Sequence, residues 1–579
     1  MSGNTFFQPY VDLLNRILAV AIEKPLLFMI QAFVTICLIT RRWTAFQKSY
    51  RQPDPSLNTQ AIPRVPYWIP FVANTLSFSS RSQSWLLSQA KAQRAGVFAL
   101  RIYGRDHVIV ASPMLCAALS DSDSLSSELS SGLRSRRFFD NPHTDQAMQI
   151  RNREAVASFK LDRSRVRKLL KLLEANTYNL ISSSRSWVDQ AQWERTAEVN
   201  VITEDPELSV SANINILIRD FVSHMFFSVL LGSSFVEANP DLLPDFFYFS
   251  SKYSTFMTGL PYWIGPGLGP PARAREKCLL TLDGLVHAII ADTERTGGSA
   301  LGVGMLYDVQ DVHPAVVKLV KSARQHNRRA KNVRSISCEV LQMLFYTTFH
   351  DVNLVVWMII YLFMKGEEYA TTLTAVKEEI TAIVRVEKPP PSGLPFQEPP
   401  RLKFKTEIVH LLAEKCPMLT ATLSEVQRLE AEYEDYFVVE KDFVLKATTD
   451  DKQDSTAGES KKRGGKFELW QGDRVHAAYG ATNKDPQYWD RPRRFVPSRF
   501  MSKSEAETDT SIAVWKSLPS RGGPGEVGGE LVLITAALLL FFEFTSMNGS
   551  GLSHPGSTIV AGMATPVRTV TGKIQRRQF

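Results

Sequence analysis

Three side chains that can move or orient a proton stand close together in one apolar stretch of the chain. They are Thr347, His350 and Asp351, within the segment YTTFHDVN. On a helix, Thr347 and Asp351 would share a face, whereas His350 would be offset from Asp351 by about 100°. The imidazole can exchange a proton near neutral pH, the carboxylate can orient it, and the hydroxyl can bind a substrate oxygen. The alternative interpretation is a core histidine whose hydrogen bonds are satisfied.

The element that must position these groups is a long helix over Ser335–Met364, because this run is predominantly apolar. Polar groups in the middle of such a helix need partners or a cavity. We therefore predict that the helix crosses the interior and lines a site at its middle.

A second set of charged residues follows. Glu425 and Arg428 form E-x-x-R on a predicted helix over Pro417–Glu430, and Arg499 lies in the motif FVPSRF. Residues three apart on a helix can pair, so an exposed ion pair is the simpler interpretation of E-x-x-R alone.

A glycine-rich loop runs into an apolar helix within Trp515–Phe544, with the helix expected from about Glu530 to Phe542. Glycines let a backbone pass close to a bulky group, and they are Gly522, Gly523, Gly525, Gly528 and Gly529. The spacing also satisfies G-x-G-x-x-G, but no strand precedes it and Glu526 would repel a phosphate. Besides close approach to a bulky group and phosphate binding, an ordinary glycine-rich loop is a third interpretation.

Composition limits the class of protein. With 579 residues, 44% hydrophobic and 22% charged, the chain can bury a large core. The net charge of +8 is scattered among acids, so no nucleic-acid partner is expected. One predicted helix carries several basic residues, for which a solvated face is the favoured interpretation: Arg163, Arg165, Arg167 and Lys168. The five cysteines have no paired spacing, so no metal site or disulfide framework is expected, and the last is Cys416.

The N-terminal part predicts a membrane anchor. Pro25–Thr40 is uncharged and apolar, and Arg41 and Arg42 follow at once, which indicates a cytosolic location for the rest of the chain. We expect an anchor over 1–45 and a stiff proline-rich hinge over 46–75. A buried core helix is the alternative.

Further elements complete the outline. The segments VFALRIY and HVIVAS predict a hairpin after a helix at Ser82–Ala95. An aromatic-rich stretch at 246–263 fits the flexible roof of an apolar pocket, while core packing and membrane contact are the alternatives. Residues 447–466 are polar and charged and predict a disordered surface insertion. A closing strand is expected within Val567–Arg577.

Taken in order, the C-terminal motifs resemble those of the cytochrome P450 family. They are Cys416-Pro417, E-x-x-R, LWQGDRV, Asp485-Pro486, Trp489, F-x-P-x-R-F and the glycine-rich loop. The resemblance implies a mainly α fold with small β-sheets over 76–579. It also implies that Glu425, Arg428 and Arg499 form an ion network beneath a haem.

The chain departs from the family at several positions. Val527 stands where the family has the cysteine thiolate that binds the haem iron, and valine has no donor atom. Ser520 replaces an aromatic residue, Glu530 a basic one, and Phe437 an arginine. The acid–threonine pair of the family's central helix is also absent. No cofactor is therefore expected, although haem without thiolate ligation is compatible with the network, and a gene-model error confined to the loop is an alternative.

The resemblance, with these losses, implies a membrane-anchored, fungal-type member of specialised metabolism. The expected function is a non-oxidative step on a lipophilic terpenoid or polyketide-like molecule, such as cyclisation, isomerisation or cycloaddition. The alternatives are a conventional monooxygenase, served by an NADPH-cytochrome reductase, and a non-catalytic membrane scaffold. The expected location is the endoplasmic reticulum, as a single-pass protein facing the cytosol.

Overall fold

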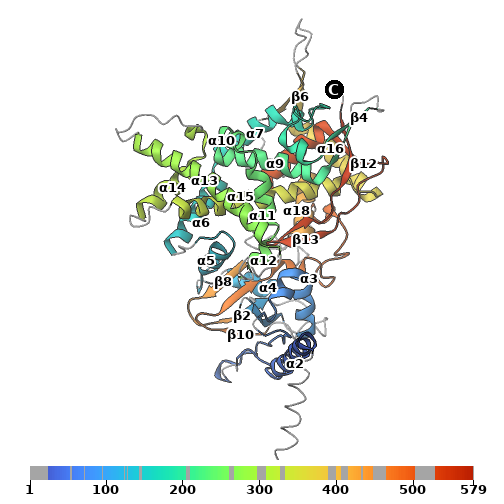
Figure 1. Ribbon diagram of the computed structural model, residues 1–579. Helices are drawn as coiled ribbons and strands as arrows, with labels where there is room; N and C mark the ends of the chain where they lie inside the picture. Colours follow the sequence, from blue (N-terminus) through green and yellow to red (C-terminus); the bar gives the residue numbers. More distant parts are fainter. Residues whose placement is uncertain are drawn as a thin grey trace, which may run out of the picture.

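The fold is organised around one central helix, α15 (Val333–Leu362), in the computed structural model. The described residues are 24–51, 55–70, 72–93, 96–102, 104–120, 122, 124–126, 128–141, 146–203, 209–257, 259, 267–295, 308–326, 333–388, 399–405, 415–431, 435–446, 465–501 and 528–577. Helix α15 passes through the middle of the larger, helical part of the molecule (Figure 1). Because it is apolar on nearly all sides, it is buried on nearly all sides.

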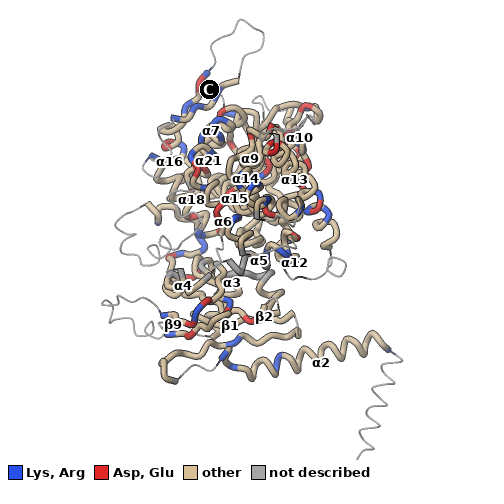
Figure 2. Tube along the Cα trace, turned by 90° about the vertical axis from the view of Figure 1, so that its left-hand side faces the viewer, with Lys and Arg blue, Asp and Glu red and all other residues tan. Residues whose placement is uncertain are grey.

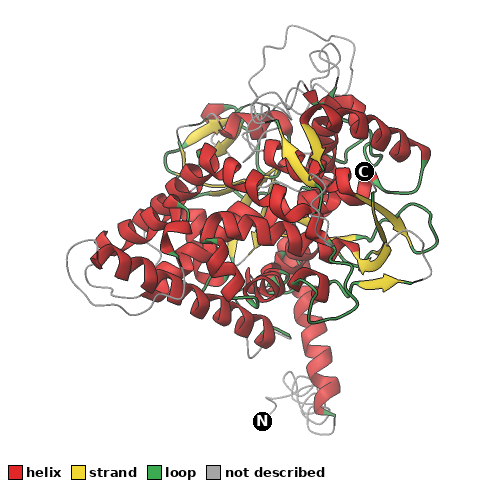
Figure 3. Cartoon of the chain, turned by 90° about the horizontal axis from the view of Figure 1, so that it is seen from above, coloured by secondary structure: helices red, strands yellow, loops and turns green. Residues whose placement is uncertain are grey.

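The surrounding helices enclose α15 and supply most of one large hydrophobic core. In chain order they are α5 (Glu128–Arg137), α6 (Gln146–Leu161), α7 (Arg163–Asn176), α8 (Gln192–Thr196), α9 (Ile214–Leu231), α10 (Ser233–Ala238), α11 (Leu242–Ser250), α12 (Tyr253–Met257), α13 (Gly269–Arg295), α14 (Pro314–His326), α16 (Glu367–Ile383), α18 (Pro417–Glu430) and α21 (Gly528–Phe541). Seen from above, helices dominate the body (Figure 3).

The sheets are small and lie around the helical part. The largest has the order β1-β2-β11-β8-β3, in which only β2 and β11 are parallel. Its strands are β1 (Val97–Ile102), β2 (Arg105–Val110), β3 (Leu125–Ser126), β8 (Asp435–Val439) and β11 (Arg474–Ala477). A second sheet has the order β12-β15-β5-β4, with β12 (Phe542–Ser546), β15 (Thr571–Arg576), β5 (Ser209–Asn213) and β4 (Asn200–Ile202).

Three antiparallel pairs complete the strands, and one of them bears on the site. These pairs are β6 (Val384–Glu387) with β7 (Arg401–Phe404), β9 (Phe443–Leu445) with β10 (Phe467–Leu469), and β13 (Ser557–Val560) with β14 (Met563–Pro566). The β13–β14 hairpin lies against α15 and, through Met563, against Ala431 at the end of α18.

The N-terminal helix α2 (Pro25–Phe46) leaves the body beside the largest sheet (Figure 2). It is long and apolar enough to cross a membrane, and none of its apolar window is buried. Two other helices, α9 and α15, meet the same length and composition criteria, but they are largely buried in the body. Burial in the protein core explains their apolar character without a membrane.

The segment after α2 folds back onto the body. The Arg41 guanidinium donates to the Pro66 carbonyl at 2.5 Å, and the Tyr67 amide donates to Thr44 Oγ1 at 3.2 Å. Main-chain hydrogen bonds then join Tyr50 to Ile62 and Val65 to Ala99 of β1. The only helical turn in the described part of this segment is a 3-10 turn at Pro55–Leu57. The proline-rich stretch therefore clamps the end of α2 to the sheet.

The predicted fold class, mainly helical with small sheets, is confirmed. Helix α18 begins and ends where predicted, and α15 and α21 lie within two residues of prediction. Helix α2 extends six residues beyond Thr40 because the basic residues there remain helical. In the first hairpin, β2 begins at Arg105, two residues before the predicted segment HVIVAS, and Arg105 pairs with Ile102.

Several predicted features lie outside the described residues. These are Val527 and Ser520 with the loop glycines up to Gly525, the insertion from 447 to 464, the first 23 residues, and most of 258–266.

Candidate functional site

The middle of α15 is where the helix stops being fully packed. From Ser335 to Leu362 every side chain is buried except Tyr346, His350 and Asp351. Tyr346 and His350 are one turn apart on the same face, and Asp351 is adjacent. Partly accessible polar groups in a central helix need space or a ligand beside them. Of the three residues singled out from the sequence, His350 and Asp351 are partly accessible and Thr347 is buried.

His350 holds the tip of the β13–β14 hairpin. Its Nε2 lies 2.9 Å from the Ala561 carbonyl oxygen, and this nitrogen must carry the hydrogen because a carbonyl only accepts. Two turns further along α15, the Trp357 indole donates to the Ala564 carbonyl at 2.8 Å. Ala561 has a left-handed backbone (φ 52°), which a non-glycine residue rarely adopts. The hairpin tip is thus fixed by α15 side chains.

Thr347 is fully buried and turned toward its own helix. Its hydroxyl lies 2.9 Å from the Met343 carbonyl and 3.2 Å from the Leu344 carbonyl. The neighbouring Thr348 makes the same kind of bond to Leu344 at 2.6 Å. A role for Thr347 toward a substrate oxygen stays a prediction, and it requires rotation away from these carbonyls.

Asp351 belongs to a group of charges from four helices, of which Arg165 and Glu530 are buried and Asp351 and Lys160 are partly buried. Glu530, at the start of α21, pairs directly with Arg165 of α7. Burial raises the pKa of the Asp351 carboxyl, opposed by the positive charges of Lys160 on α6 and of Arg165. Burial also raises the pKa of Glu530, to about 7, and the nearby Asp351 charge adds to the rise. We call these four residues, Lys160, Arg165, Asp351 and Glu530, the Glu530 cluster.

This cluster corrects one expectation from the sequence. The sequence predicts a solvated face for the basic residues at the start of α7. Arg163 and Arg167 are exposed, as predicted. Arg165 is only 3% exposed, and Lys168 bonds to Asp311 at 2.7 Å. Arg165 is buried because Glu530 offers it a carboxylate partner inside the body.

Glu425, Arg428 and Arg499 lie together in a second charged group, which we call the Arg428 network. Arg428 donates through Nε and Nη2 to both Glu425 oxygens at 2.8 Å, and Arg499 Nε lies 3.3 Å from Glu425 Oε1. Arg428 also donates to the carbonyls of Asn483, Pro492 and Arg494. The side chains of Glu425 and Arg428 are completely buried, so E-x-x-R is not an exposed pair here.

Phe437, which stands where the family has an arginine, is on β8. It pairs with Val475 of β11 and packs against an apolar cluster of the sheet. These apolar neighbours accommodate the aromatic ring.

The aromatic stretch packs mainly into the core. Phe246 and Phe249 on α11 are fully buried, and Phe249 lies against Phe138 with ring centroids 5.2 Å apart. Phe345 of α15 stacks on Phe349 at 4.8 Å. Of the three interpretations given for 246–263, core packing accounts for Phe246 and Phe249.

The side chains present do not fit a haem held by a thiolate. Val527 has no ligating atom, and none of the five cysteines lies beyond Cys416. Cys416 is placed at the start of α18, where its Sγ lies 3.7 Å from the Glu379 carbonyl, and burial raises the pKa of its thiol to about 12. Cys338 is buried within α15, where burial also raises the thiol pKa to about 12. The chain therefore supplies no cysteine thiolate for a haem at the glycine-rich loop.

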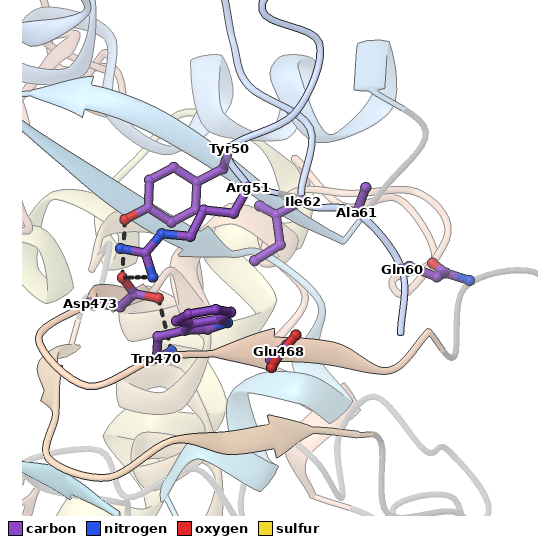
Figure 4. Close-up of a pocket in the computed structure, with 8 residues that line it drawn as sticks. All are labelled: Tyr50, Arg51, Gln60, Ala61, Ile62, Glu468, Trp470 and Asp473. Atoms are coloured by element: carbon purple, nitrogen blue, oxygen red, sulfur yellow. Dashed lines mark hydrogen bonds and ion pairs between the residues drawn. The ribbon is translucent and has the colours of Figure 1, made fainter. Parts of the chain in front are cut away.

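A pocket between the segment after α2 and the residues around β10 has a different character (Figure 4). The Arg51 guanidinium lies 5.1 Å from the ring centroids of both Tyr50 and Trp470, and it is 3.4 Å from Asp473. The Tyr50 hydroxyl donates to Asp473 at 3.0 Å, and burial raises the pKa of Tyr50 to about 12. Arg51 fills the space between the two rings. The contacts of Tyr50 and Arg51 with Trp470 and Asp473 therefore hold the segment after α2 against the strands.

Sequence reasoning missed the partnership of Lys160, Arg165 and Glu530 with Asp351. Glu530 was noted only as a departure from the family, and Arg165 only as one of several basic residues. Glu530 and Arg165 considered together could have indicated the pair. A carboxylate at the start of a buried apolar helix needs a buried cation as its partner. The segments are 365 residues apart in sequence, so the pairing itself was beyond pattern reasoning.

Comparison with known proteins gives a likeness in structure only. No family model and no curated protein matches the sequence. Among solved structures, cyanobacterial CYP120A1 with retinoic acid bound matches with a TM-score of 0.58 and 16% identity, covering 89% of this chain and 99% of that one. The chain therefore has a cytochrome P450-like fold, and at this identity the likeness shows the fold alone.

Proposed function

We propose that this chain is an enzyme that rearranges a lipophilic small molecule without oxygen activation, at the middle of α15. The observation that carries the proposal is the accessible surface of His350 and Asp351 at the middle of α15, where the other side chains from Ser335 to Leu362 are buried apart from Tyr346. Valine at position 527 supports it, because a thiolate ligand is needed for the family's oxygen chemistry. The reaction class is cyclisation, isomerisation or cycloaddition of a terpenoid or polyketide-like molecule.

The roles follow from the contacts. His350 presents an N–H at Nε2, now given to the Ala561 carbonyl, and a substrate carbonyl in that place would receive the same hydrogen bond. Asp351 can take or return a proton because burial holds its pKa above the ordinary value. A pericyclic step needs less, since shape and one hydrogen bond to an activated carbonyl suffice.

A conventional monooxygenase is the second candidate, and the Arg428 network favours it. The network is complete and buried, as the family resemblance implies for a haem site. The neighbour in structure, CYP120A1, was solved with retinoic acid, a lipophilic ligand. This candidate requires a cysteine at position 527 and an NADPH-cytochrome reductase as partner.

We further propose that α2 anchors the enzyme in the membrane of the endoplasmic reticulum, with the body in the cytosol. None of its apolar window is buried, and Arg41 and Arg42 lie toward the end that joins the body. A lipophilic substrate partitions into the same membrane, which brings it to the enzyme.

Spectroscopy and sequencing separate the two candidates. Purified protein should not show the red-shifted Soret band of a ferrous–CO thiolate complex, because no thiolate is available. The transcript across Trp515–Phe544 should encode valine at position 527. A cysteine codon there, together with the red-shifted band, would replace the first candidate with the second.

A further inference from the structure

Two buried histidines face each other in the largest sheet, where strand β2 meets β11. His107 Nδ1 lies 2.9 Å from His476 Nε2, and the two residues are 0% and 5% exposed. Only one hydrogen fits between the two nitrogens, so one imidazole donates it and the other accepts it. The bond therefore survives while at least one of the rings is neutral, and it is lost when both rings are protonated.

The pair belongs to a row of three side chains on one face of three neighbouring strands. Tyr436 of β8 pairs with His476 across the strands, and its ring lies perpendicular to the His476 ring with the centroids 4.5 Å apart. The centroids of the Tyr436 and His107 rings are 5.5 Å apart. Phe78, from helix α3 (Thr75–Gln93), packs edge-on against His476 at 5.5 Å. Aromatic rings thus surround the histidine bond and keep water from it.

Positive charges oppose the protonation of this pair. Burial is the largest cause, and with the charges of the partner histidine, Arg474 and Arg105 it holds the pKa of His107 well below the ordinary value. Tyr436, whose pKa is raised by burial, and Arg134 of α5 also face this row. A first extra proton would place a cation in a dry site beside arginines, and a second would break the bond.

The histidine bond lies where two distant parts of the chain join. Strands β1 and β2 belong to the N-terminal part and β8 and β11 to the C-terminal part, and the β2–β11 pairing covers only three residue pairs. The segment after α2 is attached to the N-terminal strands. Arg64 pairs directly with Asp106, next to His107, and the Val65 amide donates to the Ala99 carbonyl at 2.9 Å. The junction therefore affects how firmly that segment is held to the body.

We propose that His107 and His476 form an acid-sensitive lock between the N-terminal strands β1 and β2 and the C-terminal strands β11 and β8. The folded-state pKa of His107 is depressed, so the contribution of the lock is complete above the ordinary value of 6.5 and is lost as pH falls below it. In acid the rings take up protons when the junction opens. The segment that carries α2 is thus held firmly at neutral pH and loosely in acid. The lock does not depend on the proposed function, because it lies in the sheet.

Hydrogen exchange of the full-length protein tests the lock. Protection is read at 105–110 and 474–477 and corrected for the intrinsic pH dependence of exchange. Between pH 6.5 and 5.5 the wild-type protection should fall about 30-fold if opening exposes two ordinary imidazoles, and about 5-fold if it exposes one. Carboxyl groups with ordinary pKa values near 4 contribute little in this range.

Three variants make the test decisive. His107→Gln leaves one imidazole and an amide that can still donate or accept, so the fall should shrink to about 5-fold. The double variant with His476→Gln should show no fall. His224→Gln, at a partly buried histidine on α9, is the matched control and should keep the wild-type fall in the sheet.

Histidine-selective ¹⁵N NMR of the wild type gives a readout that needs no variant. Both rings of the pair should remain neutral in the folded protein at pH 5.5. An equal fall in protection in wild type and the double variant would overturn the proposal. So would a ring of the pair that titrates at the ordinary imidazole value while the sheet stays protected.

Discussion

The Arg428 network and the Glu530 cluster each contain a buried arginine–glutamate pair, yet they are built differently. In the first, Glu425 receives two arginines and the Val496 amide, and Arg428 gives its remaining donors to main-chain carbonyls. In the second, two carboxyls lie near one arginine whose Nε has no partner among the described residues. A fully matched group fixes the fold, whereas an incompletely matched group can gain or lose a proton.

The comparison is tested most severely by removing Arg428. Arg428→Ala would leave Glu425 buried without its bidentate partner, and breaking such a pair costs about 3–5 kcal/mol. We expect a large loss of soluble yield and of thermal stability at every pH between 5.5 and 8. Arg385→Ala, at an exposed pair with Glu387, is the control and should change little. Normal stability of Arg428→Ala would show that the network does not hold the fold.

Removing the arginine of the other group should have a smaller effect that depends on pH. In Arg165→Met, Glu530 loses the cation that favours its ionised form and should stay protonated over a wider range. A neutral acid is less costly to bury than an unpaired charge. We expect the destabilisation to be modest at pH 5.5 and to grow toward pH 8, as followed by thermal unfolding. A loss as large and as independent of pH as that of Arg428→Ala would erase the distinction between the two groups.

The contact between α15 and the hairpin should contribute less than either ion group. Trp357→Phe removes one hydrogen bond, to the Ala564 carbonyl, and leaves that carbonyl buried. Such a loss typically costs about 1–3 kcal/mol. Limited proteolysis near 557–566 should become faster while the rest of the body stays resistant. No change in cleavage would mean that other contacts hold the hairpin.

The smallest effect on stability is expected at α2, which lies outside both groups. Deletion of residues 1–38 should release the protein from membranes and leave thermal unfolding unchanged, because Arg41 and Thr44 still clamp the chain to the body. Deletion of 1–45 removes the clamp and should lower stability slightly. If the shorter deletion still sediments with membranes, another surface attaches the body.

The difference between the two groups also explains what the sequence could predict. Glu425 and Arg428 lie three residues apart on one helix, and Arg499 belongs to a recognisable motif, so the resemblance to the family implied the network. The long helix α15 was predicted from its apolar run, and His350 and Asp351 were picked out as polar residues at its middle. Arg165 and Glu530 meet only through the packing of α7 against α21, and no local pattern records such a contact. The environment of Val527 lies outside the described residues, so its role rests on the motif alone.

Product formation from the pathway intermediate, in anaerobic buffer without NADPH or reductase, tests the central claim most directly. Wild type should turn over under these conditions, and Asp351→Ala should be slower by about 10²–10⁴-fold, as is typical when acid–base assistance is lost. His350→Ala should also be slower if its N–H binds the substrate. Turnover that strictly requires NADPH and oxygen would contradict the account and assign the site to oxidation.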